Sequence, residues 1–528
     1  MNHRPLIIAL LGMAIGALGV LTIQNLAPRK KLDAGGNDWR KLNLILEEVE
    51  KRYVDTIDRK AMTDAAVVAA LKELDPHTVY MPPVELEESE TELAGNFDGI
   101  GIQFNVPNDT AIVIEAIPGG PAEKVGMRQG DRLLKVDGID IAGVKYPQDS
   151  MVRHMKGPAG TKVTVTVGRG SEVIPFEITR GKIPVHCVDA SFMLNDTTGY
   201  IRLAKFTRTT AQEVTLAALE LLDKNMSELI FDLRGNTGGY MDQALILANM
   251  FLDRGDMIVY MEGLHQAREE YKADGKGILS DVRLKVLIDE SSASSSEIFA
   301  GAIQDNDRGL IIGRRSFGKG LVQEPLYFTD GSGVRITIAR FYTPSGRCIQ
   351  KPYSDDYEYD IIRRFNDGEM LDADSIKVDK SEIFKTAGGR TVYGGGGIVP
   401  DVFVPVDTTK ATAFYLNCNR KATAMRFASD FFDRNRNELS SIDSFDRLMT
   451  FLDRAGLEQK FLEYARSKDG LVPAAGEWAL NRPYMMSQVR ALVGRYSKLG
   501  DNAFYHLHLD IDDTVAEALK PHELVLPE

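Results

Sequence analysis

Helical spacing of apolar residues dominates positions 38 to 74, ahead of a proline-rich stretch. The apolar positions, three or four apart, are Leu42, Ile45, Leu46 and Val49, then Ala66, Val67, Ala70, Leu71 and Leu74. This spacing places side chains on one face of a helix and predicts two helices. They should end at LDPHTVYMPP, residues 74–83, because its three prolines exclude continuation of a helix.

Between residues 95 and 182 the pattern changes to short β-like runs. These runs are GIGIQFNV, AIVIEAI, RLLKVDG, KVTVTVGR and VIPFEITR, and Gly, Pro and Asp separate them. Strand-forming runs bounded by turn residues predict a small, mostly β module.

From residue 199 onward, expected strands alternate with helical spacing. The strands are GYIRLAKF, ELIFDLR, LKVLID and GLIIG; the helices span 211–222, about 242–251, and a segment that follows a serine run and ends at 306. Such alternation is typical of an α/β core with a largely parallel sheet.

The last part of the chain, residues 411–528, is helical in pattern and rich in charge. Near its end Tyr505, His506, Leu507 and His508 alternate, which favours one face of a strand. Two histidines at this spacing are also a metal-binding pattern. The strand is the favoured interpretation, and we predict no metal here.

An apolar run of 18 residues without a charge, Leu6–Ile23, lies near the minimum length for spanning a bilayer. Arg4 precedes the run and residues 29–31 add three more basic side chains after it, so flanking charge does not fix its orientation. We predict a membrane anchor or signal segment with a linker over residues 1–36, and we favour an uncleaved anchor.

The composition, 44% hydrophobic and 26% charged over 528 residues, is that of a folded protein with several domains. A net charge of −13 argues against a general nucleic-acid binder, which needs a basic surface. Cys187, Cys348 and Cys418 are odd in number and far apart. This excludes a disulfide framework and a site built from several thiolates.

The stretch GRRSFGKGLVQ, residues 313–323, superficially resembles a phosphate-binding loop. Such a loop needs Ser or Thr after its lysine and a helix behind it. Here Gly320 follows Lys319, and LVQEPLYF reads as a strand. Nucleotide binding is therefore disfavoured, and Lys319 needs another role.

The stretch KVLIDESSASSSEIFAGAIQDN, residues 285–306, predicts a strand, a polar turn and a helix. A serine at the start of that helix lies beside unpaired backbone N–H groups, which can stabilise an oxyanion. Ser294 followed by Glu297 is also a capping box, the more ordinary interpretation of the run taken alone.

None of the eight histidines accompanies a serine in a catalytic signature, although a histidine-dependent triad is not excluded. A serine and lysine pair needs no histidine. Only about one free lysine in 2,500 is neutral at pH 7, and lowering its pKa by about three units costs on the order of 4 kcal/mol, which burial can supply. Lys319, between two glycines and near Phe317 and Leu321, has small and apolar neighbours in sequence.

The region from SSASSSE to FGKGLVQ resembles the active site of the carboxy-terminal processing peptidases, also called tail-specific proteases, which are Ser/Lys endopeptidases. In that family the middle serine of S-A-S-x-S-E is the nucleophile and the lysine of F-G-K-G, 25 residues later, is the base; Ser294 and Lys319 match. Gln323 matches a glutamine that orients the lysine in some members. Further landmarks are LDPHTVY, DLRGNTGG (232–239), ARFYTPSGR (339–347) and GGIVPD (396–401), so the resemblance covers roughly residues 40 to 405.

The same resemblance implies an oxyanion hole. One N–H comes from Gly238 or Gly239, with the choice open, and another from Ser295. Position 295 is Ser where the family usually has Ala, so Ser296 is the main competitor for the role of nucleophile. The chain after residue 410 matches no pattern of the family.

The segment IPGGPAEKVGMRQGDRLLKVDGIDIAG, residues 117–143, resembles a PDZ domain, with Gly130-Asp131 before a strand and Asp137-Gly138 in a hairpin turn. By this resemblance, one loop holds the terminal carboxylate of a peptide on backbone N–H groups, and the strand beside it adds the peptide as a further strand. The matching residues are Gly99, Ile100, Gly101 and Ile102.

The resemblance implies a multidomain α/β fold: a crotonase/ClpP-like protease core with an inserted PDZ-like β module and helical N- and C-terminal parts. The expected parts are 1–36, the anchor or signal segment; 37–94, helical; 95–182, PDZ-like; 183–410, the protease core; and 411–528, mostly helical and of unknown role.

The expected function is that of a serine endopeptidase that cleaves proteins recognised by their exposed C-termini, anchored to the inner membrane of a bacterium or exported to its periplasm. We expect no cofactor, no metal and no nucleic-acid partner, and a homo-oligomer is compatible with the sequence. The alternative is an inactive PDZ scaffold that binds C-termini. The serine, lysine and glutamine at matched spacing argue against it.

Overall fold

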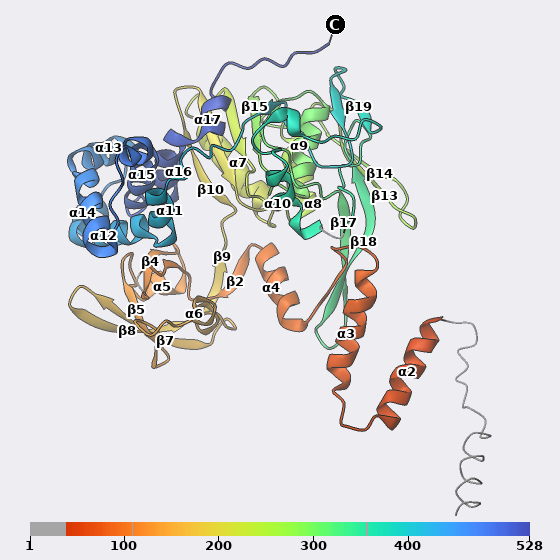
Figure 1. Cartoon of the computed structure of the whole chain (residues 1–528), viewed down its shortest axis with the longest axis horizontal. Helices are drawn as coiled ribbons and strands as arrows, with labels where there is room; N and C mark the ends of the chain where they lie inside the picture. Colours follow the sequence, from red (N-terminus) through yellow and green to blue (C-terminus); the bar gives the residue numbers. More distant parts are fainter. Residues whose placement is uncertain (1–37, 108, 355–356, 528) are drawn as a thin grey trace, which may run out of the picture. The chain divides into compact units, whose positions relative to one another are not determined.

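The computed structural model describes residues 38–107, 109–354 and 357–527, and the chain divides into two compact units, 1–74 and 75–528. In the first unit, α2 (Asp38–Arg52) and α3 (Arg59–Lys72) confirm the two predicted helices (Figure 1). Asp58 caps α3 by accepting the Ala61 N–H at 3.0 Å. No described helix is long and apolar enough to cross a membrane, and the apolar run of residues 6–23 lies outside the described residues.

The second unit begins at Asp75, within the LDPHTVYMPP stretch. The prolines exclude continuation of α3, as predicted, but Pro83 also begins a helix, α4 (Pro83–Leu93). Proline is favourable in a first helical turn, where its missing N–H has no intrahelical acceptor. Within the same stretch lies β1 (Val79–Met81).

The predicted β module is present as a sheet in the order β3-β4-β5-β7-β8, with β6 paired to β5. Its strands are β3 (Ile102–Asn105), β4 (Ala111–Ala116), β5 (Arg132–Val136), β6 (Ile139–Asp140), β7 (Lys162–Arg169) and β8 (Glu172–Thr179); its helices are α5 (Pro121–Lys124) and α6 (Gln148–Met155). Asp137 and Gly138, with φ of 47° and 80°, form the predicted hairpin turn. The chain enters through β2 (Asn96–Gly99) and leaves through its antiparallel partner β9 (Gly181–Pro184).

The α/β core is a six-stranded sheet in the order β10-β11-β12-β15-β16-β21, parallel except for the edge strand β10. Its strands are β10 (Val188–Met193), β11 (Thr198–Leu203), β12 (Glu228–Asp232), β15 (Arg283–Ile288), β16 (Leu310–Gly313) and β21 (Val402–Phe403). The largely parallel sheet is therefore confirmed. The predicted helices are α7 (Thr210–Leu222), α8 (Met241–Asn249) and α9 (Ser295–Asp305).

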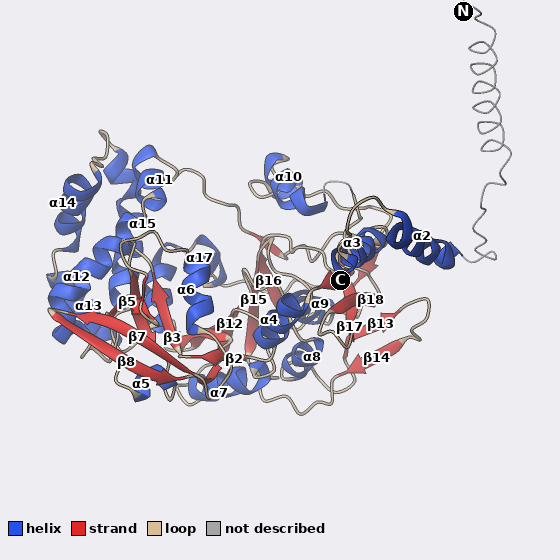
Figure 2. Cartoon of the chain, turned by 90° about the horizontal axis from the view of Figure 1, so that it is seen from below, coloured by secondary structure: helices blue, strands red, loops and turns tan. Residues whose placement is uncertain are grey.

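The two faces of this sheet bury different parts of the chain. Helices α7, α8 and α9 pack on one face through side chains such as Val214, Leu247 and Phe299. The other face packs against Val515 and Ala518 of α17 (Asp513–Ala518). Figure 2 shows α17 and the pair α7 and α8 on opposite sides of the strands.

A second sheet has the order β1-β18-β13-β14, with β17 also paired to β18. Its strands are β13 (Met257–Glu262), β14 (Glu269–Lys272), β17 (Leu321–Tyr327) and β18 (Gly333–Tyr342). Strand β17 confirms that LVQEPLYF is a strand and not a helix. After β18 the chain forms a 3-10 turn (Tyr357–Tyr359), α10 (Asp360–Asn366), a second 3-10 turn (Ala373–Ser375), β19 (Ile383–Lys385) and β20 (Thr391–Tyr393).

The C-terminal part is helical, as predicted. Before α17 it contains α11 (Ala413–Arg420), α12 (Thr423–Leu439), α13 (Phe445–Arg454), α14 (Leu457–Asp469), α15 (Glu477–Gly494), α16 (Asp501–His508) and a 3-10 turn (Leu509–Ile511). Arg436 of α12 donates to the Gly130 carbonyl oxygen at 3.0 Å, so this part touches the β module as well as the core sheet.

The predicted strand at Tyr505–His508 is wrong, because these residues lie in α16. Four alternating residues are too few to separate a period of two from a helical face. The two histidine rings stack on different partners, His506 on Phe445 and His508 on Phe504. No group of three His, Cys, Asp or Glu suited to a metal is found in the described part of the chain.

Candidate active site

Ser294 lies between strand β15 and helix α9, the topology that the serine run predicted. Its φ of 56° and ψ of −113° are rare for a residue with a side chain. Such strained positions cluster at functional sites, where the surrounding structure holds them.

Three other serines of the run have fixed structural bonds. The hydroxyls of Ser292, Ser295 and Ser296 each donate to a backbone carbonyl oxygen, of Leu233, Gly239 and Asn236, at 2.8, 2.9 and 2.9 Å respectively. The hydroxyl of the half-buried Ser294 donates to no carbonyl among the described residues. Its proton is thus free for transfer, whereas that of Ser296 is buried and engaged.

The buried carboxylate of Glu297 joins the two predicted catalytic segments. One of its oxygens, Oε2, accepts the backbone N–H of Ser294 at 2.9 Å and that of Lys319 at 2.8 Å. The other, Oε1, accepts the Gly318 N–H at 2.7 Å and the Ser316 hydroxyl at 2.5 Å. The backbones of Ser294 and Lys319, 25 residues apart in sequence, therefore meet on one atom.

Sequence reasoning gave Glu297 only its capping role. The capping box is present. The bonds from Glu297 to the Ser316–Lys319 segment depend on tertiary packing. Apart from the 25-residue spacing of Ser294 and Lys319, nothing in the sequence predicts them. Burial raises the pKa of Glu297, although all these hydrogen bonds favour its ionised form.

Lys319 lies two residues before β17 and is partly buried. Burial lowers the pKa of Lys319 and the charge of Arg335 lowers it further, while Glu297 and Asp75 oppose the shift. The net direction favours a neutral amine, the form that can accept a proton.

Gln323 reaches back to the LDPHTVY turn. Its Nε2 donates to the His77 carbonyl oxygen at 2.5 Å. No hydrogen bond joins Gln323 to Lys319 in the described part of the chain, so the predicted orientation of that lysine by Gln323 stays a prediction.

Gly238 and Gly239 follow β12, and Gly238 lies against Ser294. A Cβ added to Gly238, where φ is 96°, would stand 2.8 Å from the Ser294 Cβ, so only glycine fits. The Gly238 N–H donates to Asn236 Oδ1 at 2.9 Å. The N–H groups of Gly239 and Ser295 have no acceptor among the described residues, which favours Gly239 in the choice that the sequence left open.

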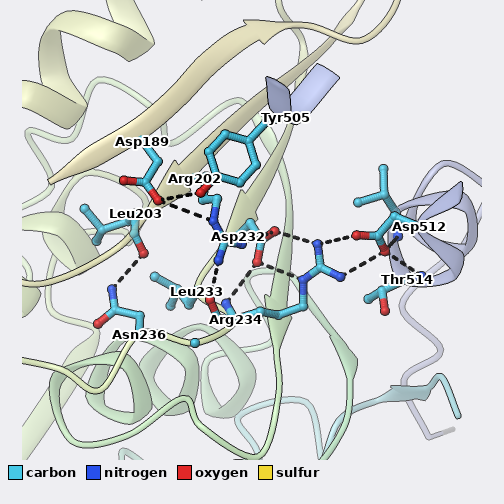
Figure 3. A network of polar contacts seen from close by, with 12 residues as sticks. Asp189, Arg202, Leu203, Asp232, Leu233, Arg234, Asn236, Tyr505, Asp512 and Thr514 are labelled. Atoms are coloured by element: carbon cyan, nitrogen blue, oxygen red, sulfur yellow. Dashed lines mark hydrogen bonds and ion pairs between the residues drawn. The ribbon is translucent and has the colours of Figure 1, made fainter. Parts of the chain in front are cut away.

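An ion-pair network holds the start of this glycine loop (Figure 3). Asp232, at the end of β12, is buried and accepts from Tyr200, Arg202 and Arg234. Arg234 also bonds Asp512 at 2.9 Å, close to α17 in sequence. Arg234 and Arg202 offset the burial of Asp232 and hold the pKa of its carboxyl at about 2.

The four predicted peptide-binding residues form one loop between β2 and β3. Gly99 ends β2, Ile102 begins β3, and the backbone N–H groups of Ile100 and Gly101 have no acceptor among the described residues. Strand β3 stands at one end of its sheet, so its outer edge can pair with a further strand. No hydrogen bond in the described chain joins this loop to Ser294 or Lys319, so it is a separate site.

Comparisons with known proteins match both regions. A sequence model of peptidase family S41 matches residues 197–361, and one of the PDZ domain matches residues 99–179. The carboxy-terminal processing protease CtpA of Bacillus subtilis is 33% identical over 325 residues, 61% of this chain and 69% of that protein. The carboxy-terminal-processing protease of Bartonella bacilliformis is 35% identical over 312 residues, 58% of this chain and 71% of that protein. A solved photosystem II D1 C-terminal processing protease is 29% identical with a TM-score of 0.38, covering 70% of this chain and 87% of that chain.

Proposed function

Because the chain belongs to the carboxy-terminal processing proteases, serine peptidases of family S41 with a PDZ domain, we propose that Ser294 is its nucleophile and Lys319 its general base. The observation that carries this assignment is the shared Glu297 oxygen, which accepts the backbone N–H of both residues. The relatives are named proteases, which favours an active enzyme over an inactive PDZ scaffold.

In this mechanism the neutral Lys319 amine takes the proton of the Ser294 hydroxyl as the oxygen attacks the scissile carbonyl carbon. The N–H groups of Gly239 and Ser295 stabilise the resulting oxyanion. The Lys319 ammonium then returns the proton to the leaving amine, the C–N bond breaks, and an acyl ester remains on Ser294. A water molecule, activated by the again neutral Lys319, hydrolyses the ester and restores the serine.

The loop Gly99–Ile102 is proposed to hold the terminal carboxylate of the protein substrate. The unpaired N–H groups of Ile100 and Gly101 support this, because converging backbone N–H groups bind anions. The open edge of β3 would pair with the extended tail of the substrate. Replacing the terminal carboxylate of a model substrate by an amide should raise KM with little change in kcat.

We also propose a fold type for the core, a membrane anchor and a cellular location. The core sheet and its helices are assigned to the crotonase/ClpP-like type, on the basis of the alternating, largely parallel topology. The uncharged run of residues 6–23 supports an inner-membrane anchor and a periplasmic body in a bacterium. Membrane fractionation of the full chain, compared with a chain lacking residues 1–36, tests the anchor.

The catalytic assignment is tested with the full chain and a reporter protein that carries an exposed apolar tail. Ser294→Ala and Lys319→Ala should each abolish cleavage while thermal unfolding stays unchanged, and a serine-directed phosphonate should label Ser294 in the wild type. Ser296→Ala should keep most of the activity, because that hydroxyl only bonds the Asn236 carbonyl. Cleavage by Ser294→Ala, or a label on Ser296, would refute the assignment.

A further inference from the structure

The Lys319 backbone is held by Glu297, but its side chain needs a separate constraint to aim the amine at Ser294. Gln323 is the candidate, and the orientation of its amide is fixed by the bond from Nε2 to the His77 carbonyl oxygen. With Nε2 engaged, the other end of the amide, Oε1, remains as a hydrogen-bond acceptor. An acceptor serves Lys319 in both protonation states, because the amine and the ammonium both carry N–H donors.

The His77 carbonyl oxygen is itself held in place from two sides. On one side, Asp75 Oδ1 accepts the backbone N–H groups of His77 and Thr78, each at 2.8 Å. On the other side, the imidazole Nε2 of His77 lies 2.7 Å from the hydroxyl of Tyr357, and the two rings meet edge to face. Backbone and ring together fix the direction of the carbonyl that Gln323 uses.

The Tyr357 hydroxyl continues the chain of bonds back to the lysine segment. It accepts from Gln350 Nε2 at 3.3 Å, and Gln350 Oε1 accepts the Gly320 N–H at 3.0 Å. A circuit of hydrogen bonds therefore runs from Gly320, next to Lys319, through Gln350 and Tyr357 to His77, and returns to β17 at Gln323. The two attachment points, Gly320 and Gln323, both follow Lys319 in the chain.

We propose that His77 and Tyr357 form a positioning pair that orients Gln323 and, through it, the Lys319 amine; this inference rests on the proposed role of Lys319 as the base. His77 is a positioning residue and not a catalytic one, because its contacts are with Tyr357, Asp75 and Gln323. With Gln350 donating to the Tyr357 oxygen, the tyrosine proton is directed to His77 Nε2. This places the imidazole proton on Nδ1.

The charge state of the pair agrees with this role. The charged groups that act on His77 are Asp75, Lys319 and Lys351. Burial and the charge of Lys319 lower the pKa of His77 to about 4, with Lys351 adding to the shift and Asp75 opposing it. A neutral imidazole can accept from Tyr357 and adds no positive charge beside the base.

The test uses the full chain and the same tailed reporter. His77→Phe keeps a ring beside Tyr357 but removes the hydrogen bond, Tyr357→Phe removes its partner, and His77→Gln places an amide where Nε2 was. The control is Tyr359→Phe on the same 3-10 turn, whose side chain is 63% exposed. His77→Phe and Tyr357→Phe should each lower kcat roughly tenfold with KM nearly unchanged. They should also move the acid limb of the kcat/KM profile to lower pH, because an amide oxygen that accepts from the Lys319 ammonium stabilises it, and its loss lowers the pKa of Lys319.

Two results separate positioning from a merely structural role. The double variant should be no worse than either single variant, because both remove one hydrogen bond, and His77→Gln should recover most of kcat. Wild-type kcat and pH profile in His77→Phe, additive losses in the double variant, or losses without a shift of the pH profile would overturn the inference. Ser294→Ala separates a failure of the positioning role from a failure of the proposed function. If Ser294→Ala is inactive while His77→Phe is normal, only the positioning role fails.

Discussion

Two carboxyl groups near the candidate active site, those of Asp232 and Glu297, are equally buried, but their pKa values shift in opposite directions. Both side chains are fully shielded from solvent, and each accepts several hydrogen bonds. Asp232 faces the guanidinium groups of Arg202 and Arg234, and its pKa is lowered to about 2. Glu297 accepts only from uncharged N–H and O–H groups, and burial raises its pKa.

At Glu297 the hydrogen bonds alone do not offset the burial of the charge. Countercharges do so at Asp232, which ties the glycine loop to the C-terminal part through Arg234 and Asp512. At Glu297 the ionised form would raise the pKa of Lys319, which in the proposed mechanism must be neutral to accept a proton. A carboxylate with a raised pKa organises the catalytic backbone and opposes the neutral amine less.

Asp232→Asn should be the most destabilising change, because it leaves two guanidinium groups facing a neutral amide. Breaking a buried ion pair by removing one partner costs about 3–5 kcal/mol of unfolding free energy. Urea denaturation measures the loss, and Asp513→Asn, with a 57% exposed side chain, is the control that should change little. A loss under about 1 kcal/mol would mean that countercharges are not what holds Asp232.

Glu297→Gln should destabilise the protein less than Asp232→Asn but lower its activity more. In the variant, an amide nitrogen, which is a donor, replaces one carboxylate oxygen, which accepts two hydrogen bonds. The two groups that donate to this oxygen would then face another donor, at a cost of about 2–4 kcal/mol. The segments of Ser294 and Lys319 would separate, and kcat should fall roughly 100-fold, the size expected for a misplacement near 1 Å. Glu290→Gln, which affects only the Arg314 pair, is the control for activity. Full activity in Glu297→Gln would show that the shared oxygen does not organise the site.

Local rules predicted most elements and the position of Ser294. Turn residues gave the Asp137-Gly138 hairpin, and the strand, turn and helix around Ser294 followed from apolar spacing. The same rules failed at α16, where four alternating residues were assigned to a strand. Alternation over so short a segment is compatible with either structure.

The contacts that define the site were beyond local rules. Asp512 lies 278 residues after Arg234, and no spacing in the sequence connects them. The choice between Gly238 and Gly239 depends on the side chain of Asn236, because its Oδ1 accepts the N–H of Gly238. Glu297 was visible as a cap, whereas its bond to the Lys319 N–H exists only once the Ser316–Lys319 segment packs against the start of α9.

The stability penalties of the two variants should depend on pH with opposite signs. The lowered pKa of Asp232 contributes stability above the unfolded value of 3.8, and that contribution is lost as pH falls toward about 2. The raised pKa of Glu297 contributes below the unfolded value of 4.5 and is lost as pH rises through the folded value.

The penalty of Asp232→Asn should therefore shrink by about 1 kcal/mol between pH 7 and pH 3. That of Glu297→Gln should be larger at pH 4 than at pH 8. Urea denaturation of each variant against the wild type at each pH isolates these sites from the other titrating groups. Penalties that move in the same direction would contradict the assigned pKa shifts.

Asp512→Asn should have the smallest effect, because Arg234 keeps its bonds to Asp232. The asparagine can still cap α17, where Asp512 now accepts the N–H groups of Thr514 and Val515, so only the charge is lost, at about 1 kcal/mol. Asp512→Ala removes the cap as well and should cost about 1 kcal/mol more. If urea denaturation gives equal losses for the two variants, Asp512 acts through Arg234 alone. If instead Asp512→Asn is neutral, the countercharge that holds Asp232 lies entirely within the core, and the C-terminal part contributes only its cap.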